Sequence, residues 1–302
     1  MRVDTQPPNE HPNPDLARLL AKSLKAQWKR YRKALQKCQR GFAGESVHDS
    51  RIETRRLLAR LELLGAFLPE AHLAKAWRLL KRHLDSFSAL RDIQVQRQRV
   101  ARLLPRFPAM LDFDRALDER ERREIKQARQ AVKRFRIGKL RRLIEPVREE
   151  LESQGTRKVS RRTARAVAAA FAEVARRRER VEPNDTATIH RTRVAFKHFR
   201  YMIEGLRDAL PRLSPARLRA MQSYQASMGE IQDVEVLMAA LRKFARQERI
   251  DPDVARPWFA ELQRQRRRLI GRYLKRAGAL DDFWTGADAR TLEGEPRRSE
   301  QP

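Results

Sequence analysis

The chain has 302 residues and a net charge of +29 at pH 7, because 68 lysines and arginines face 39 acidic residues. No stretch approaches the ~18 uncharged apolar residues that a membrane span needs, and a single cysteine, Cys38, excludes an intramolecular disulfide. So large a positive excess weakens a folded chain by self-repulsion and is best tolerated when the partner is a polyanion, for which nucleic acid, an anionic membrane surface and inorganic polyphosphate all qualify.

The first half of the chain shows apolar residues at helical spacing throughout. The expected helices cover residues 15–40, 46–69, 72–105 and 110–152. Ser46 is the expected N-cap of the second helix. The third should break near residues 86–88, and the fourth should bend at Gly138 and Pro146. Residues 1–12, which are polar and rich in proline, are expected to form a disordered lead-in.

The second half begins after "SQGTRK" (153–158), the best candidate for a linker. Helices are expected over residues 160–181, from 187 to Pro211, onward from there with a break around Met228 and Gly229, and over 252–280. "EPND" (182–185) should end the first of these and cap the next. Residues 285–302 are expected to be a disordered tail. No strand pattern occurs anywhere, so the expected fold class is all-α.

A segment of the first half recurs in the second. Residues 47–64 align with residues 189–206, at a separation of 142, and this places His48 on His190, Arg51 on Arg193, Arg55 on Lys197, Arg56 on His198 and Glu62 on Glu204. Further along, "RDIQV" (91–95) falls on "QDVEV" (232–236). Self-similarity of this kind indicates an internal duplication. We therefore expect two similar helical bundles, over residues 13–152 and 159–284.

The shared basic residues of each copy lie on one side of a helix that turns ~100° per residue. In the first copy Arg51 and Arg55 fall within ~60° of His48, whereas Leu57 and Leu61 point to the opposite side. Each copy should therefore present a ladder of cations ~11 Å long. A single such helix is more often a plain solvated face. The same pattern on the same face of both copies favours an anion-binding surface, because clustered arginines repel one another unless an anion joins them.

At these residues the chain resembles the CHAD family, the conserved-histidine α-helical domain. The family motif, roughly His-x-x-Arg-Val-x-x-Arg-Arg-Leu-Arg, is matched by "HDSRIETRRLLAR" (48–60) and "HRTRVAFKHFRYM" (190–202). A second signature, Leu-Gly-x-x-Arg-Asp-x-Asp-Val, is matched loosely by "FSALRDIQV" (87–95) and "MGEIQDVEV" (228–236). The resemblance covers roughly residues 13–284, and the paired His/Arg helices are its most specific part.

The resemblance implies two pseudo-symmetric helical bundles that face each other across a basic groove or pore. It also implies binding of inorganic polyphosphate, often with localisation to polyphosphate granules. Carried over residue by residue, the polyphosphate-binding set is His48, Arg51, Arg55, Arg56, His190, Arg193, Lys197 and His198. His198 stands where the family usually has arginine, and Gln232 replaces the arginine of the second signature. These departures imply weaker binding by the second half or a shift of contact to other helices.

Several further charged residues are assigned roles around this surface. Lys81, Arg82 and Arg91 are the candidates for extending it. The acids that align between the two copies are interpreted as structural groups that hold arginines in place or cap a helix. They are Asp92 with Asp233 and Glu62 with Glu204.

The sequence contains no convincing motif of another functional class. The chain has no glycine-rich phosphate loop, no HExxH and no metal-ligand cluster, so we expect no cofactor, no metal site and no catalysis. Trp258, Phe259 and Tyr273 fall on apolar stripes, which assigns them to the core and argues against base stacking. The expectation is a non-enzymatic polyphosphate-binding protein, placed in the cytoplasm because the amino terminus lacks a signal-peptide core. A non-specific nucleic-acid-binding protein is the alternative, and a phosphatase-like enzyme comes third.

Overall fold

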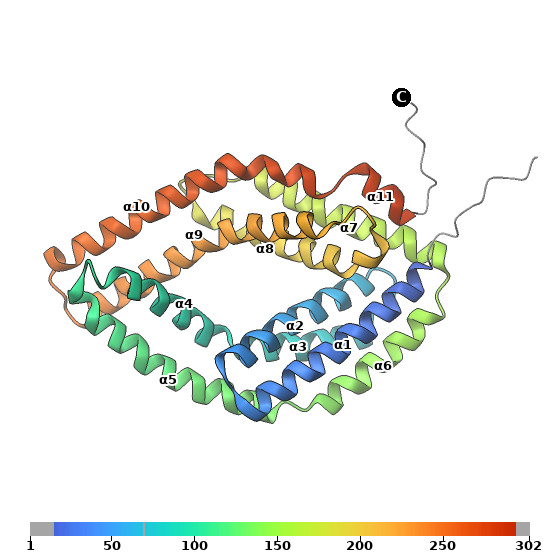
Figure 1. The fold of residues 1–302 in the computed structure, drawn as a ribbon, viewed down its shortest axis with the longest axis horizontal. Coiled ribbons are helices and arrows are strands. Elements are labelled where there is room, and N and C mark those ends of the chain that lie inside the picture. Colours follow the sequence, from blue (N-terminus) through green and yellow to red (C-terminus); the bar gives the residue numbers. More distant parts are fainter. Residues whose placement is uncertain (1–14, 69, 294–302) are drawn as a thin grey trace, which may run out of the picture.

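The computed structural model describes residues 15–68 and 70–293, and every regular element within these ranges is a helix (Figure 1). The all-α prediction is confirmed for this part of the chain. The first six α-helices are α1 (Leu16–Gly41), α2 (Gly44–Leu64), α3 (Glu70–Asp85), α4 (Ser88–Leu103), α5 (Leu111–Arg134) and α6 (Ile137–Glu152). They are followed by α7 (Thr156–Glu179), α8 (Thr186–Gly205), α9 (Pro215–Gln247), α10 (Pro252–Arg276) and α11 (Gly286–Glu293). Three short 3-10 turns cover Pro108–Met110, Arg207–Ala209 and Ala277–Phe283.

The helices pack as long antiparallel neighbours, and one contact joins segments far apart in the chain. α1 packs on α2, α6 and α7, while α3 lies between α2 and α6. α7 and α9 flank α8, α10 packs along α9, and α4 reaches from α5 across to α9. α2 also packs against α8. The two helices that carry the repeated basic motif are therefore neighbours in space.

Local capping explains where several helices begin. The Asp15 side chain accepts a hydrogen bond from the backbone N–H of Arg18 at the start of α1, and Asp185 accepts one from Ala187 at the start of α8. Ser214 caps α9 in the same way, and proline follows it at the first helical position, where no N–H is needed. The predicted stop and cap at 182–185 are confirmed.

Other helix boundaries depart from the sequence expectation. Helix α2 begins at Gly44, so Ser46 is its third residue, and the Ser46 hydroxyl bonds to the backbone of Ala43 instead of acting as the N-cap. The charged stretch 110–152 is two helices that separate at residues 135–136, not one helix bent at Gly138. Gln39 on α1 donates to the carbonyl oxygen of Val132 at 3.0 Å, and the Phe135 ring lies 4.5 Å from that of His83. Packing against α1 and α3 therefore keeps α5 and α6 as separate helices.

Both ends of the second half also differ from expectation. α7 begins at Thr156, so only residues 153–155 of the expected linker lie between helices. The expected disordered tail contains α11, where the buried carboxylate of Asp288, 2% exposed, accepts two hydrogen bonds from Arg217. That pair anchors α11 and explains its order. The lead-in 1–12 and the end of the tail, 294–302, lie outside the described residues. No helix in the described ranges is long and apolar enough to cross a bilayer.

Candidate anion-binding site

The contact between α2 and α8 brings four cations together, two from each helix. Arg51 and Arg55 come from α2, and Arg193 and Lys197 come from α8; we call these four the central cluster. Burial lowers the pKa of Arg193 and of Lys197, and the positive charge of Arg55, across the helix pair, lowers both further. The basic residues of α2 and α8 therefore lie closely enough together for their charges to interact.

Burial makes these charges costly for the free protein. Arg51 is only 7% exposed, and the other three side chains are half-buried. Loss of solvent is the main cause that lowers the pKa of Arg51 to about 10 and that of Lys197 to about 8. Neighbouring cations add to the effect, Arg55 and Arg91 for the first and Arg55 for the second. The charged form of a buried group is destabilised in this way unless an opposite charge lies beside it.

The central cluster also holds unused hydrogen-bond donors. The Nε atoms of Arg51, Arg55 and Arg193 are buried and have no hydrogen-bond partner among the described residues. Within the same part of the chain, no ion pair joins any of the four cations to a carboxylate. A buried donor left unpaired costs about 1–3 kcal/mol. Three arginine side chains of the cluster therefore keep a donor for which the described residues supply no acceptor.

A glycine of α9 makes room for one of these arginines. A Cβ atom at Gly229 would lie 3.3 Å from the Nε atom of Arg193, which is tighter than ordinary contact. α9 runs unbroken through this position, so the expected break around Met228 and Gly229 was wrong. Gly229 serves as a surface against which the Arg193 guanidinium lies. The sequence signal for this role of Gly229 was present in "MGEIQDVEV", where a glycine interrupts an otherwise helical pattern.

Two aspartates lie near the cluster, on α4 and α9. Burial raises the pKa of Asp92 and of Asp233. The charge of Arg51 opposes this rise at Asp92, and the charges of Arg99 and Arg193 oppose it at Asp233. Asp233 forms an ion pair with Arg99 of α4, with Oδ2 and Nη2 3.7 Å apart. Asp233 therefore interacts with Arg99 and also partly offsets the charge of Arg193. The interpretation of Asp233 as a structural acid agrees with this contact.

The two histidines of the repeat occupy different environments. His48 is exposed near the start of α2. His190 is half-buried, and its pKa is lowered first by burial and then by the charge of Arg193, while an interaction with Gln232 opposes the change. Its Nδ1 atom has no hydrogen-bond partner in the described ranges. His190 therefore lies within electrostatic reach of the central cluster.

Arg56 and His198, which align in the repeat, are engaged by acids instead. Arg56 pairs with Glu53 at 2.7 Å and lies 4.0 Å from Glu204 of α8. His198 lies 3.1 Å from Glu62 of α2. These reciprocal contacts tie α2 to α8, and Arg56 and His198 therefore differ from the central cluster in having acidic partners. Glu62 in addition accepts a hydrogen bond from the Trp77 indole.

The three candidate extensions separate in space. The charge of Lys81 contributes to lowering the pKa of Lys197, after burial and the two cluster arginines, which places Lys81 beside the cluster. Arg91 acts in the same way on Arg51. Arg82 instead lines a pocket of about 490 Å³ between α3 and α6, whose other polar lining residues are also cationic. Lys81 and Arg91 therefore flank the central cluster, and Arg82 belongs to another face of α3.

Comparison with known proteins identifies the family. The family model of the CHAD domain matches residues 22–242. The chain is a member of the CHAD domain family. This CHAD protein is similar in structure to a CHAD domain from the plant Ricinus communis, with 22% sequence identity, a TM-score of 0.63 and coverage of 93% of this chain and 92% of that one. It is also similar to PptA from Streptomyces chartreusis, with 18% identity, a TM-score of 0.66 and coverage of 87% and 98%.

These likenesses extend the family assignment to the fold. At such identities the two solved structures support the arrangement of helices and nothing finer. No curated protein matches the sequence of this CHAD protein. The resemblance inferred from the paired motifs at 48–60 and 190–202 is confirmed at the level of the family.

Proposed function

We propose that this CHAD protein binds inorganic polyphosphate without catalysis, through the central cluster of Arg51, Arg55, Arg193 and Lys197. The observation that carries the proposal is the burial of these four cations, together with the unpaired Nε donors of the three arginines and the lack of an ion pair to any of the four among the described residues. A guanidinium donates two parallel hydrogen bonds to phosphate oxygens and stays charged at neutral pH. A chain of phosphates supplies both the negative charge and the acceptors that the cluster lacks.

The reciprocal placement of the four cations favours a linear ligand. Two cations come from α2 and two from α8, at positions 142 residues apart, and the paired contacts Arg56–Glu204 and His198–Glu62 repeat the same relation. We propose that these contacts reflect an internal duplication, and that the two halves share one basic groove. A single polyphosphate chain lying between the helices then meets matching groups from both halves.

The contacts made by the acids around the central cluster support a role in binding without catalysis. Hydrolysis of a phosphoanhydride needs a group that activates water or a metal that does so. Asp233 is paired with Arg99, and Glu62 is engaged by Trp77 and His198. These contacts fit acids that position cations, which is the basis for proposing a binding protein.

The test compares two variants of equal charge. The first replaces the four cations of the central cluster by glutamine. The second replaces four exposed cations on α5 by glutamine, namely Arg120, Arg123, Lys126 and Arg129. Both lose four positive charges, so a general effect of net charge is the same in the two proteins.

Affinity for long-chain polyphosphate should fall at least about 100-fold in the cluster variant, equivalent to roughly two charge-assisted hydrogen bonds. The α5 variant should bind within about fivefold of wild type, because exposed charges at a distance are screened by salt. The slope of log affinity against log salt should fall by about 3 in the cluster variant, at roughly 0.7 for each charge lost. Equal loss in both variants, with both folded, would assign binding to net charge and refute the site.

A further inference from the structure

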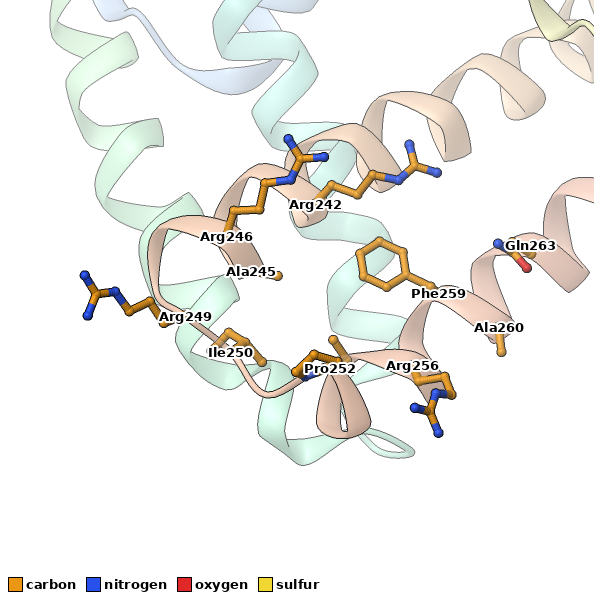
Figure 2. Close-up of a pocket in the computed structure, with 11 residues that line it drawn as sticks. Arg242, Ala245, Arg246, Arg249, Ile250, Pro252, Arg256, Phe259, Ala260 and Gln263 are labelled. Atoms are coloured by element: carbon orange, nitrogen blue, oxygen red, sulfur yellow. The ribbon is translucent and has the colours of Figure 1, made fainter.

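A pocket of about 640 Å³ opens at the tip of the α9–α10 hairpin (Figure 2). Its walls come from the last turns of α9 and the first turns of α10, joined by Ile250 and Pro252. From Asp233 to Arg246 is 13 residues of α9, or about 20 Å of helix. The pocket is therefore a separate site with its own chemistry. Its volume lies within the ~300–1,000 Å³ typical of small-molecule sites.

Two arginines on α9 supply uncompensated charge at this pocket. Arg242 and Arg246 are one turn apart, and Figure 2 shows both guanidinium groups on the same side of the opening. Among the described residues neither forms an ion pair, and no acid lines the pocket. Like charges four residues apart on a helix repel each other. The pocket is therefore electrostatically complementary to an anion.

The two other arginines at the pocket are placed differently. Arg256 pairs with Asp253 at 2.5 Å, so its charge is already compensated. In Figure 2 the Arg249 side chain projects away from the Phe259 ring. The positive charge available to a ligand is therefore that of Arg242 and Arg246. Arg256 provides a natural control, because it lines the same pocket without offering a free charge.

An aromatic ring forms part of the same pocket. Phe259 is half-buried on α10, and the guanidinium carbon of Arg242 lies 5.9 Å from the centre of its ring. The sequence assigned Phe259 to the core together with Trp258. Trp258 is buried, with 3% exposed, but Phe259 lines the pocket beside Ile250 and small alanines. Phe259 packs against the edge of the core while part of it lines the pocket, because adjacent residues on a helix point ~100° apart and Trp258 is the one that faces fully inward.

We propose that the α9–α10 pocket binds a nucleoside di- or triphosphate. The base lies against Phe259 and the apolar wall, and the phosphates accept hydrogen bonds from Arg242 and Arg246. Base stacking on aromatic side chains and phosphate contacts from arginine are the two interactions that this lining offers. Inorganic polyphosphate uses only the second of them, which distinguishes the ligand of this pocket from that of the central cluster.

Calorimetry on the full chain tests the proposal. The protein carries the four glutamine substitutions of the central-cluster variant, so that phosphate binding at the central cluster does not contribute. The ligands are ATP, tripolyphosphate, which lacks the base, and adenosine, which lacks the phosphates. ATP should bind at least about tenfold tighter than either fragment, since each fragment engages half of the pocket.

Three further variants in the same background assign the contacts. Phe259→Leu keeps an apolar side chain in place and should weaken ATP roughly tenfold, the effect of losing a stacked base, without changing the affinity for tripolyphosphate. Arg242→Gln with Arg246→Gln should weaken both phosphate ligands, whereas Arg256→Gln should leave both within about twofold. Equal affinity for ATP and tripolyphosphate, or an unchanged ATP affinity in Phe259→Leu, would overturn the proposal. Neither result bears on polyphosphate binding by the wild-type chain, so a failure of the nucleotide proposal can be distinguished from a failure of the polyphosphate proposal.

Discussion

Lys197 should make polyphosphate binding depend on pH in an alkaline window. Burial, followed by the charges of Arg55 and Arg193, lowers the pKa of Lys197 from 10.5 to about 8. At 1.36 kcal/mol for each pH unit, this difference amounts to about 3 kcal/mol for keeping the ammonium charged in the free protein. Solvent screening around a half-buried group brings the figure nearer to about 2 kcal/mol. A bound polyanion removes most of that cost, because it places negative charge beside the amine.

The sign of the effect follows from proton binding. Below pH 8 Lys197 is protonated in both the free and the bound protein, and its contribution to affinity is constant. Between pH 8 and about 10.5 the free protein loses the proton and the complex retains it, so binding must take up a proton. Affinity should therefore fall by about tenfold between pH 8 and 9.5. In the free protein the same group makes folding stability rise with pH over this window, because the unfolded chain binds the proton more strongly.

Calorimetry at pH 9 in two buffers of different ionisation enthalpy measures the proton directly. Wild type should take up close to one proton for each chain of polyphosphate bound. Lys197→Arg keeps its charge throughout and should bind with little change in affinity from pH 8 to 9.5. Lys197→Gln should bind more weakly at pH 7 and show no uptake. If Lys197→Arg loses affinity with pH as steeply as wild type, another group is responsible and the reasoning fails.

Three other outcomes are expected. Gly229→Ala should weaken polyphosphate binding, because the added Cβ would lie 3.3 Å from the Nε atom of Arg193 and would push the guanidinium away. Gly271→Ala, where nothing lies within 4 Å of the added Cβ, should leave binding unchanged and stabilise α10 by about 1 kcal/mol. Denaturant melts and binding assays compare the two variants. His190, whose pKa is lowered by burial and then by Arg193, should gain a proton on binding in mildly acidic solution, so affinity should rise as pH falls toward 5.5 and this rise should vanish in His190→Gln. Asp288→Asn should cost about 2 kcal/mol through the lost hydrogen bonds to charged Arg217; an unchanged urea midpoint would show that this pair does not anchor α11.

The helices and the family could be predicted from local patterns. Apolar spacing and the caps at Asp185 and Ser214 depend only on residues a few positions apart, so those boundaries were within reach of the sequence. The split between α5 and α6 was not, because Gln39 and His83, more than 50 residues away, hold it. The order of α11 likewise depends on Arg217, which lies 71 residues before Asp288. Helix ends determined by distant partners leave no local signal.

The sequence by itself determined that two helices, 142 residues apart, carry matching cations on one face, since helical periodicity is a local property. Only the tertiary structure decided which of those cations remain without a partner. Arg56 and His198 contact Glu204 and Glu62 of the opposite helix, while Arg51 is buried and forms no ion pair within the described residues. The electrostatic state of a side chain depends on the solvent removed and the charges brought near by its neighbours in space, and the order of residues along the chain does not specify these.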